Sequence, residues 1–319
     1  MNSMSSVYTP LQSFETKFLT DYSKKDAIWD DKKNVSEQVE QRYSTEQEFE
    51  RIAKRMSECG LSLGFAESVD TATGEIQHRL KTAHFCHVRN CPTCSWRRTM
   101  RNKREFLSKL PKVLEAYPTH RFLFLTLTVP NCNISDLRAT LSDMGKSWKR
   151  LINRKEFAKV DGWVRSTEVT YSKSSSGNAH PHFHVMLMVK PSYFNGGGYV
   201  KQDQWLKAWQ GSMRDDSITQ VDIRAMKGDK AISEVLKYAV KESDLVDSPK
   251  QWFFELTRQV HKLRFIATGG LLKDMLKEEM TTAEMIAGDE TESEDKADDE
   301  VKLLASWSPS KKRYKAKYV

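Results

Sequence analysis

The sequence has no run of apolar residues near the roughly 18 that a membrane-spanning helix needs, and its mean hydropathy is −0.64. Both features exclude an integral membrane protein. The first residues supply neither the basic segment nor the apolar stretch of a secretion signal, so we expect a cytoplasmic protein. The 5 cysteines are an odd number for a disulfide framework, and a reducing compartment would keep them as thiols.

Two catalytic signatures are also missing. There is no GxxxxGK[ST] phosphate-binding loop, so any helicase must be a separate partner. There is no HExxH motif, which argues against a zinc hydrolase that acts on small molecules.

What the chain has is enough apolar material for a core, and an excess of positive charge. Of its 319 residues, 39% are hydrophobic and 10% are aromatic, which excludes wholesale disorder. The 51 lysines and arginines outnumber the 43 aspartates and glutamates, and the formal net charge of +8 modestly favours a polyanionic partner. The length suits one large domain or two smaller ones.

Apolar and charged residues divide the chain into four parts. Residues 1–45 hold few apolar residues in no clear period and predict a mostly flexible leader with at most a short helix. The acidic run 289–300 and the basic run 311–317 predict a charged tail over 271–319, helical or disordered. Between them we expect a basic, cysteine-containing element over 46–110 and a folded domain over 111–270.

Within this folded domain, strand-forming runs are interleaved with helical periodicity. Turn residues between Tyr171 and His182 predict that two strands pair as a hairpin. A hairpin in such a series favours an α+β class, with a central antiparallel sheet flanked by helices, over a doubly wound parallel sheet. The expected strands are 121–129, 162–171, 182–189 and 219–225, and the expected helices are 134–157, 204–213, 230–242 and 251–265.

Three cysteines lie close together in the basic element. Cys91 and Cys94 have the two-residue spacing that aims two thiolates at one tetrahedral Zn²⁺, and Cys86 is a third ligand. We select Cys59 as the fourth, because Gly60 permits a tight turn and a ligand from a separate strand closes the site. The alternatives to Cys59 are His78, His84 and His87, and the isolated Cys132 is expected to be a packed or free thiol.

The residues that follow these cysteines are basic. No acidic residue lies between His84 and Arg104, and a zinc-braced helix start of this charge suits contact with phosphates. The same pattern also fits a solvated helix face. The candidate DNA-binding residues are Arg89, Arg97, Arg98, Arg101, Lys103 and Arg104.

His182 and His184 form the most informative pattern. In a strand they share one face, while Phe183 and alternate residues after it anchor the other face in the core. If the hairpin turn centres near residue 176, Glu168 lies opposite His184 and is the third ligand of a divalent metal ion. His180 is the alternative, disfavoured because a proline follows it. A mixed nitrogen and oxygen site with open positions suits Mn²⁺ or Mg²⁺ acting on phosphate, although histidine also accepts Zn²⁺.

A second pattern lies in the helix predicted over 230–242. Glu234, Tyr238 and Lys241 share one face of that helix, which alone is most often a surface salt-bridge pattern. Combined with the histidine strand it predicts chemistry, because a phenolate attacks phosphorus, a metal ion polarises the phosphate and a lysine offsets developing charge.

These residues carry a family resemblance. The segments Phe124–Pro130, His180–Met186 and Tyr238–Lys241 resemble, in that order, the three motifs of the HUH endonucleases, in which two histidines flank a hydrophobic residue and a YxxK motif follows. The cysteine cluster with its Trp-Arg-Arg continuation, and Glu234 four residues before the tyrosine, resemble the replication initiators of small rolling-circle plasmids. The resemblance covers residues 55–270.

The resemblance implies an enzyme that nicks origin DNA and transfers the cut strand. Tyr238 would form a 5′-phosphotyrosine and release a 3′-OH that primes synthesis, Glu234 would activate water for the terminating cleavage, and Lys241 would assist electrostatically. The implied cofactors are Mn²⁺ or Mg²⁺ at the histidines and a structural Zn²⁺. The implied partners are plasmid origin DNA, single-stranded or in a hairpin, a host helicase and a single-strand DNA-binding protein.

Two rival hypotheses stay open. Another HUH nuclease would use the same chemistry, but relaxases carry their tyrosine near the N-terminus and single-stranded DNA transposases are generally shorter. A zinc-containing DNA-binding regulator without catalysis would use the histidine strand as core, and would bind DNA without cutting it.

Overall fold

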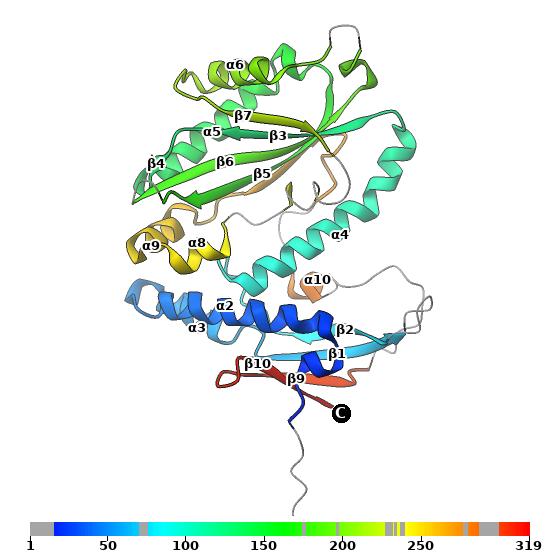
Figure 1. The fold of residues 1–319 in the computed structure, drawn as a ribbon, viewed down its shortest axis with the longest axis vertical. Coiled ribbons are helices and arrows are strands. Elements are labelled where there is room, and N and C mark those ends of the chain that lie inside the picture. Colours follow the sequence, from blue (N-terminus) through cyan, green and yellow to red (C-terminus); the bar gives the residue numbers. More distant parts are fainter. Residues whose placement is uncertain are drawn as a thin grey trace, which may run out of the picture.

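The computed structural model describes residues 16–69, 76–173, 177–195, 198–226, 232, 235, 236, 240–276, 280–286 and 300–319. None of the helices in these ranges is long and apolar enough to cross a membrane. The chain forms two antiparallel sheets with helices packed around and between them (Figure 1). The predicted α+β class is therefore confirmed.

The larger, six-stranded sheet contains the predicted hairpin, and its strands follow the order β7-β3-β6-β5-β8 with the short β4 attached to β6. β5 and β6 are the hairpin. The strands are β3 (Arg121–Thr128), β4 (Cys132–Asn133), β5 (Val160–Tyr171), β6 (Asn178–Val189), β7 (Val221–Ala225) and β8 (Ile266–Gly270). β8 was not predicted. The helix predicted over 251–265 is observed as α9 (Lys250–Gln259), which ends earlier than expected.

Helices cover both faces of this sheet. On one face, Phe183 and the alternate residues after it pack against α5 (Leu137–Leu151) and α6 (Gln202–Met213), as the strand periodicity predicted. On the other face, Met186 and Met188 pack with Phe106 of α4 (Pro92–Ala116). His182 and His184 share this second face, so they point toward the side of the sheet that α4 crosses.

The smaller, four-stranded sheet joins the two ends of the chain in the order β10-β9-β1-β2. It packs with the N-terminal helices and with the start of α4, and Figure 1 shows it stacked below the larger sheet. Its strands are β1 (Ser62–Val69), β2 (Ile76–Ala83), β9 (Leu303–Ser308) and β10 (Arg313–Tyr318), and the helices around it are α1 (Leu19–Tyr22), α2 (Ala27–Tyr43), α3 (Glu50–Ser57) and α10 (Thr282–Ile286).

This sheet corrects two predictions. The prediction of a mostly flexible leader over residues 1–45 is wrong for residues 27–43, which form the helix α2. The apolar residues of this helix are few, but Trp29, Val39 and Tyr43 are buried in the core and hold it in place. The prediction of a helical or disordered tail is wrong for the basic run 311–317, most of which lies in strand β10. Buried and exposed side chains alternate along this strand: Tyr314 and Ala316 are buried, and the lysines between and after them face outward. Of the acidic run, only Glu300 lies within the described residues.

The helix predicted over 230–242 is also corrected at its end. Ile232 and Val235 are buried in the core, but Val240 forms a parallel bridge with Val169 of β5. A separate helix, α8 (Glu242–Asp247), begins after Lys241, whose backbone is extended. Glu234 and Tyr238 lie outside the described residues.

Candidate metal and nucleic-acid sites

Glu168, His182 and His184 meet on the face of the hairpin that is turned toward α4. Glu168 Oε2 lies 3.1 Å from His182 Nε2 and 2.8 Å from His184 Nε2, and the two nitrogens are 3.1 Å apart. The predicted register is wrong, because Glu168 pairs with His182 and Ser166 pairs with His184. The difference is an even number of residues, so Glu168 still shares the histidine face.

The spacing of these three atoms fits a divalent ion. Ligands about 2.1 Å from an ion lie about 3 Å apart when they are adjacent in an octahedron, which matches the distances between the two nitrogens and the carboxylate oxygen. Glu168 and His182 are 7% and 8% exposed, so the ion would be largely shielded from solvent. Three protein ligands leave positions open for water or a phosphate oxygen.

The outer ring nitrogens have partners that orient the imidazoles. His182 Nδ1 lies 3.4 Å from the carbonyl oxygen of His180, and His184 Nδ1 lies 3.3 Å from Thr126 Oγ1. Donation through Nδ1 would direct both Nε2 lone pairs toward a bound metal ion. Burial raises the pKa of Glu168, but contacts with the two imidazoles outweigh it and hold this pKa well below its usual range, so the carboxylate is ionised.

His180, the alternative third ligand, is directed elsewhere. Its Nδ1 lies 2.8 Å from Asn131 Oδ1, and it is not among the residues whose ligand atoms converge. Lys241 is exposed at the start of α8. The structure therefore brings Glu168 and the histidine pair together, while the catalytic roles of Glu234, Tyr238 and Lys241 remain sequence predictions.

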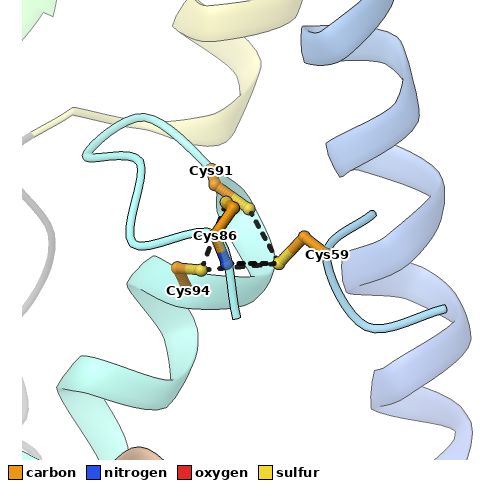
Figure 2. Close-up of side chains that lie close together, drawn as sticks. All are labelled: Cys59, Cys86, Cys91 and Cys94. Carbon is orange, nitrogen blue, oxygen red and sulfur yellow. Dashed lines mark hydrogen bonds between the residues drawn. The ribbon is translucent and has the colours of Figure 1, made fainter. Parts of the chain in front are cut away.

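Four cysteines converge between the two sheets. Figure 2 shows Cys91 and Cys94 at the start of α4, Cys86 on the loop before it and Cys59 on a separate segment. The Sγ–Sγ distances are 3.5 Å for Cys59–Cys94, 3.5 Å for Cys86–Cys94 and 3.8 Å for Cys91–Cys59. A tetrahedral Zn²⁺ with Zn–S bonds of about 2.3 Å needs sulfurs about 3.8 Å apart, so this cluster is close to that geometry.

The structure groups Cys59, and not a histidine, with the other three cysteines. His78 Nδ1 lies 3.2 Å from Asp26 Oδ2, and His87 Nε2 lies 2.8 Å from Thr282 Oγ1. Gly60 has a φ of +63°, the left-handed conformation that the expected tight turn requires. Burial raises the pKa of Cys91, but hydrogen bonds from the other three thiols outweigh it and lower this pKa well below its ordinary value.

Residues from both chain ends hold the cysteine cluster, which sequence reasoning missed. Lys33 of α2 donates a hydrogen bond to the Cys59 carbonyl oxygen at 2.7 Å. Tyr314 of β10 donates to the Gly60 carbonyl oxygen at 2.6 Å. These partners are distant in sequence from the cysteines, and the packing of α2 and β10 around the cluster brings them together.

The basic residues around and after the cysteines differ in burial. Arg97 is 0% exposed and its Nε and Nη2 donate to the Met285 carbonyl oxygen at 2.9 and 2.6 Å, so its assignment to a DNA-binding surface is wrong. Its guanidinium also lies over the rings of Trp29 and Trp96. The other candidates are not fully buried: Arg89, Arg98, Arg101, Lys103 and Arg104.

The larger antiparallel sheet carries the two histidines on one strand face, and the four-cysteine cluster lies at the start of α4. A model of the replication protein family matches residues 77–315, and the chain belongs to this family. The resemblance to plasmid replication initiators is thereby confirmed.

Curated relatives match almost the whole chain. The protein rep of Streptococcus pneumoniae serotype 2 (strain D39 / NCTC 7466) is 34% identical over 313 residues, which cover 94% of this chain and 96% of the relative. The protein rep of Lentilactobacillus hilgardii is 34% identical over 281 residues, covering 82% and 87%. That of Bacillus amyloliquefaciens is 34% identical over 294 residues, covering 82% and 84%. No solved structure matches the chain at a significant level.

Proposed function

We propose that this replication initiator nicks one strand of its origin DNA and transfers that strand to Tyr238, with a divalent metal ion held by Glu168, His182 and His184. The observation that carries the proposal is the convergence of these three side chains, with ligand atoms 2.8 to 3.1 Å apart, on the face of the sheet turned toward α4. Two imidazole nitrogens and a carboxylate oxygen form a ligand set that suits a divalent metal ion.

The position of the chain on either side of the tyrosine supports this role. Thr99 of α4 donates a hydrogen bond to the Leu236 carbonyl oxygen at 3.3 Å, and Val240 bridges Val169, the neighbour of Glu168. Leu236 therefore lies on the side of the sheet that faces α4, and Val240 lies beside β5, next to the strand that carries Glu168.

The reaction follows from these residues. The Tyr238 oxygen attacks phosphorus, the bond from phosphorus to the 3′ oxygen breaks, and a 5′-phosphotyrosine and a free 3′-OH form. The phenol loses its proton and the 3′ oxygen gains one, so the step is balanced. A bound Mn²⁺ or Mg²⁺ would polarise the scissile phosphate. Glu234 would later remove a proton from the water that ends the cycle, and Lys241 would offset developing charge.

The four cysteines would hold a separate, structural Zn²⁺. Four thiolate ligands close a tetrahedral site and leave no position for substrate. All four cysteines are buried, and the cluster fixes the loop that leads into α4. Because the chain carries no phosphate-binding loop of the helicase type, unwinding would fall to a host helicase, with a single-strand DNA-binding protein on the displaced strand.

The proposal is tested with single-stranded oligonucleotides that span the origin, incubated with the full chain and Mn²⁺ or Mg²⁺. Denaturing electrophoresis should show a covalent DNA adduct, and peptide mapping should place it on Tyr238. Tyr238→Phe should abolish the adduct, whereas Tyr199→Phe, at a 50% exposed tyrosine, should not. Specific binding without an adduct, under both metals, would instead support a non-catalytic regulator.

A further inference from the structure

A basic groove separates α4 and its preceding loop from the segment that leads into β8. Its volume is about 710 Å³. His87, Arg89, Arg98 and Asn102 line the α4 side, and Lys262 and Arg264 line the other. None of the described residues that line this groove is acidic. We call it the α4–β8 groove.

The α4–β8 groove continues toward the metal ligands. A smaller pocket of about 110 Å³ shares Arg89 and Arg98 with it and reaches Ser166 and Thr167, the residues just before Glu168 in β5. One acidic residue, Glu242, lines this pocket, but Lys32 Nζ contacts its carboxylate at 2.6 Å. A path with a strong excess of positive charge therefore runs from the surface toward the proposed reaction centre.

The cations nearest that centre are held in place. Arg98 Nη2 donates to the Val88 carbonyl oxygen at 3.1 Å, and Arg89 Nη2 donates to the Leu263 carbonyl oxygen at 2.5 Å. The Arg89 guanidinium also lies 4.5 Å from the centre of the Phe265 ring. Burial, and then the charge of Arg98, lower the pKa of Arg89 to about 10, so it stays charged at neutral pH.

Repulsion between clustered positive charges destabilises the folded protein unless a bound anion neutralises them. Among the described residues, the hydrogen bonds of Arg89 and Arg98 are to neutral carbonyl oxygens, which do not neutralise the two positive charges. Phosphates are the anions that a replication protein meets on its substrate. Cations on both sides of one groove suit a single sugar-phosphate backbone.

We propose that the α4–β8 groove binds the phosphates of the single DNA strand that continues from the scissile bond. This inference rests on the proposed function and adds the path of the substrate. A single strand is favoured because the path narrows from about 710 Å³ to about 110 Å³ and the nearby ligands Glu168 and His182 are nearly buried. The groove also gives the cysteine cluster a functional consequence, because Arg89 and Arg98 stand on the loop and helix that the cluster fixes.

The test measures binding of a single-stranded origin oligonucleotide by fluorescence anisotropy over a series of KCl concentrations. All variants carry Tyr238→Phe and receive no added divalent ion, so the result does not depend on whether Tyr238 is the nucleophile. Arg98→Gln changes one side of the groove, Arg264→Gln changes the other, and Lys207→Gln, on the exposed surface of α6, is the control. Circular dichroism and zinc content check that each variant is folded.

Each groove variant should bind several-fold more weakly at low salt. The slope of log K against log salt should fall by about 0.7 for each phosphate of the single strand that the variant no longer neutralises. Arg264→Gln keeps the test valid if Arg98→Gln fails to fold. Unchanged affinity and slope in Arg264→Gln, or an equally large effect of Lys207→Gln, would overturn the proposal.

Binding of a duplex of the same sequence tests whether the groove prefers single-stranded DNA. The groove variants should weaken binding of the single strand more than binding of the duplex, and equal weakening of both would refute the single-strand assignment. If the chain forms no tyrosine adduct at all, the proposed function fails while the groove measurement still reports on DNA binding.

Discussion

Val240 pairs with Val169 through an isolated parallel bridge, and this contact fixes the segment after Tyr238 beside the strand that carries Glu168. In the sequence Val240 lies two residues after the proposed nucleophile, and in the fold it lies next to the strand that carries a proposed metal ligand. Periodicity did not predict this bridge, since a continuous helix was expected over 230–242.

The metal site yields the first prediction. Replacing His182 or His184 with alanine should lower Mn²⁺-dependent nicking by at least about 100-fold, because loss of a residue that only supports a metal ligand already costs about 10- to 100-fold. Manganese binding, followed by electron paramagnetic resonance, should be lost in parallel. His180→Ala is the matched control and should keep both properties. A larger effect at His180 than at Glu168→Gln would make His180 the third ligand.

The same site shows how far sequence reasoning reaches. Strand alternation correctly put His182 and His184 on one face and placed Glu168 with them, because a side-chain period of two survives a register error of two residues. The register itself was wrong, since composition does not fix where a turn centres. The partner Thr126 was not predicted, because pairing of β3 with β6 is a contact between segments distant in sequence.

Patterns of charged residues predicted the structure less well than patterns of apolar residues. The basic run at the C-terminus suggested a solvated tail, yet its alternation with Tyr314 and Ala316 builds a strand of the smaller sheet. Arg97 belonged to a basic helix start, yet it is a buried structural residue. Lys262 and Arg264 were not selected at all, because they are far in sequence from the cysteines. A charge pattern does not reveal which tertiary partners a side chain will meet.

Arg97 supplies a prediction that separates structure from DNA contact. Arg97→Met should lower the free energy of unfolding by at least about 2 kcal/mol, because the carbonyl oxygens of Met285 and Ile286 lose a charged donor inside the core. Urea denaturation measures this change. Among molecules that remain folded, affinity for origin DNA should be unchanged. Arg264→Gln should show the opposite pattern, and weakened DNA binding by stable Arg97→Met protein would contradict the structural role.

The cysteine cluster predicts one tightly bound zinc ion per chain. Cys59→Ser should release it and destabilise the protein by several kcal/mol, since structural zinc contributes about 10–16 kcal/mol of apparent binding free energy in zinc-finger peptides. Elemental analysis and thermal unfolding would follow the two effects. Cys132→Ser and His84→Ala should change neither, because both residues lie outside the cluster. Full zinc content in Cys59→Ser would show that another residue completes the site.

Glu234 predicts a separation of two reaction steps. Joining of the cut strand uses a 3′-OH that DNA itself supplies, whereas terminating hydrolysis needs a base to take a proton from water, and such bases contribute about 10²- to 10⁴-fold. Glu234→Gln keeps the shape of the side chain but removes the base, so nicking and joining should persist while hydrolysis falls by a factor in that range. Oligonucleotides labelled at either end, followed in single-turnover reactions, distinguish the products. If nicking, joining and hydrolysis all fell equally, Glu234 would have to act by holding the fold rather than by activating water.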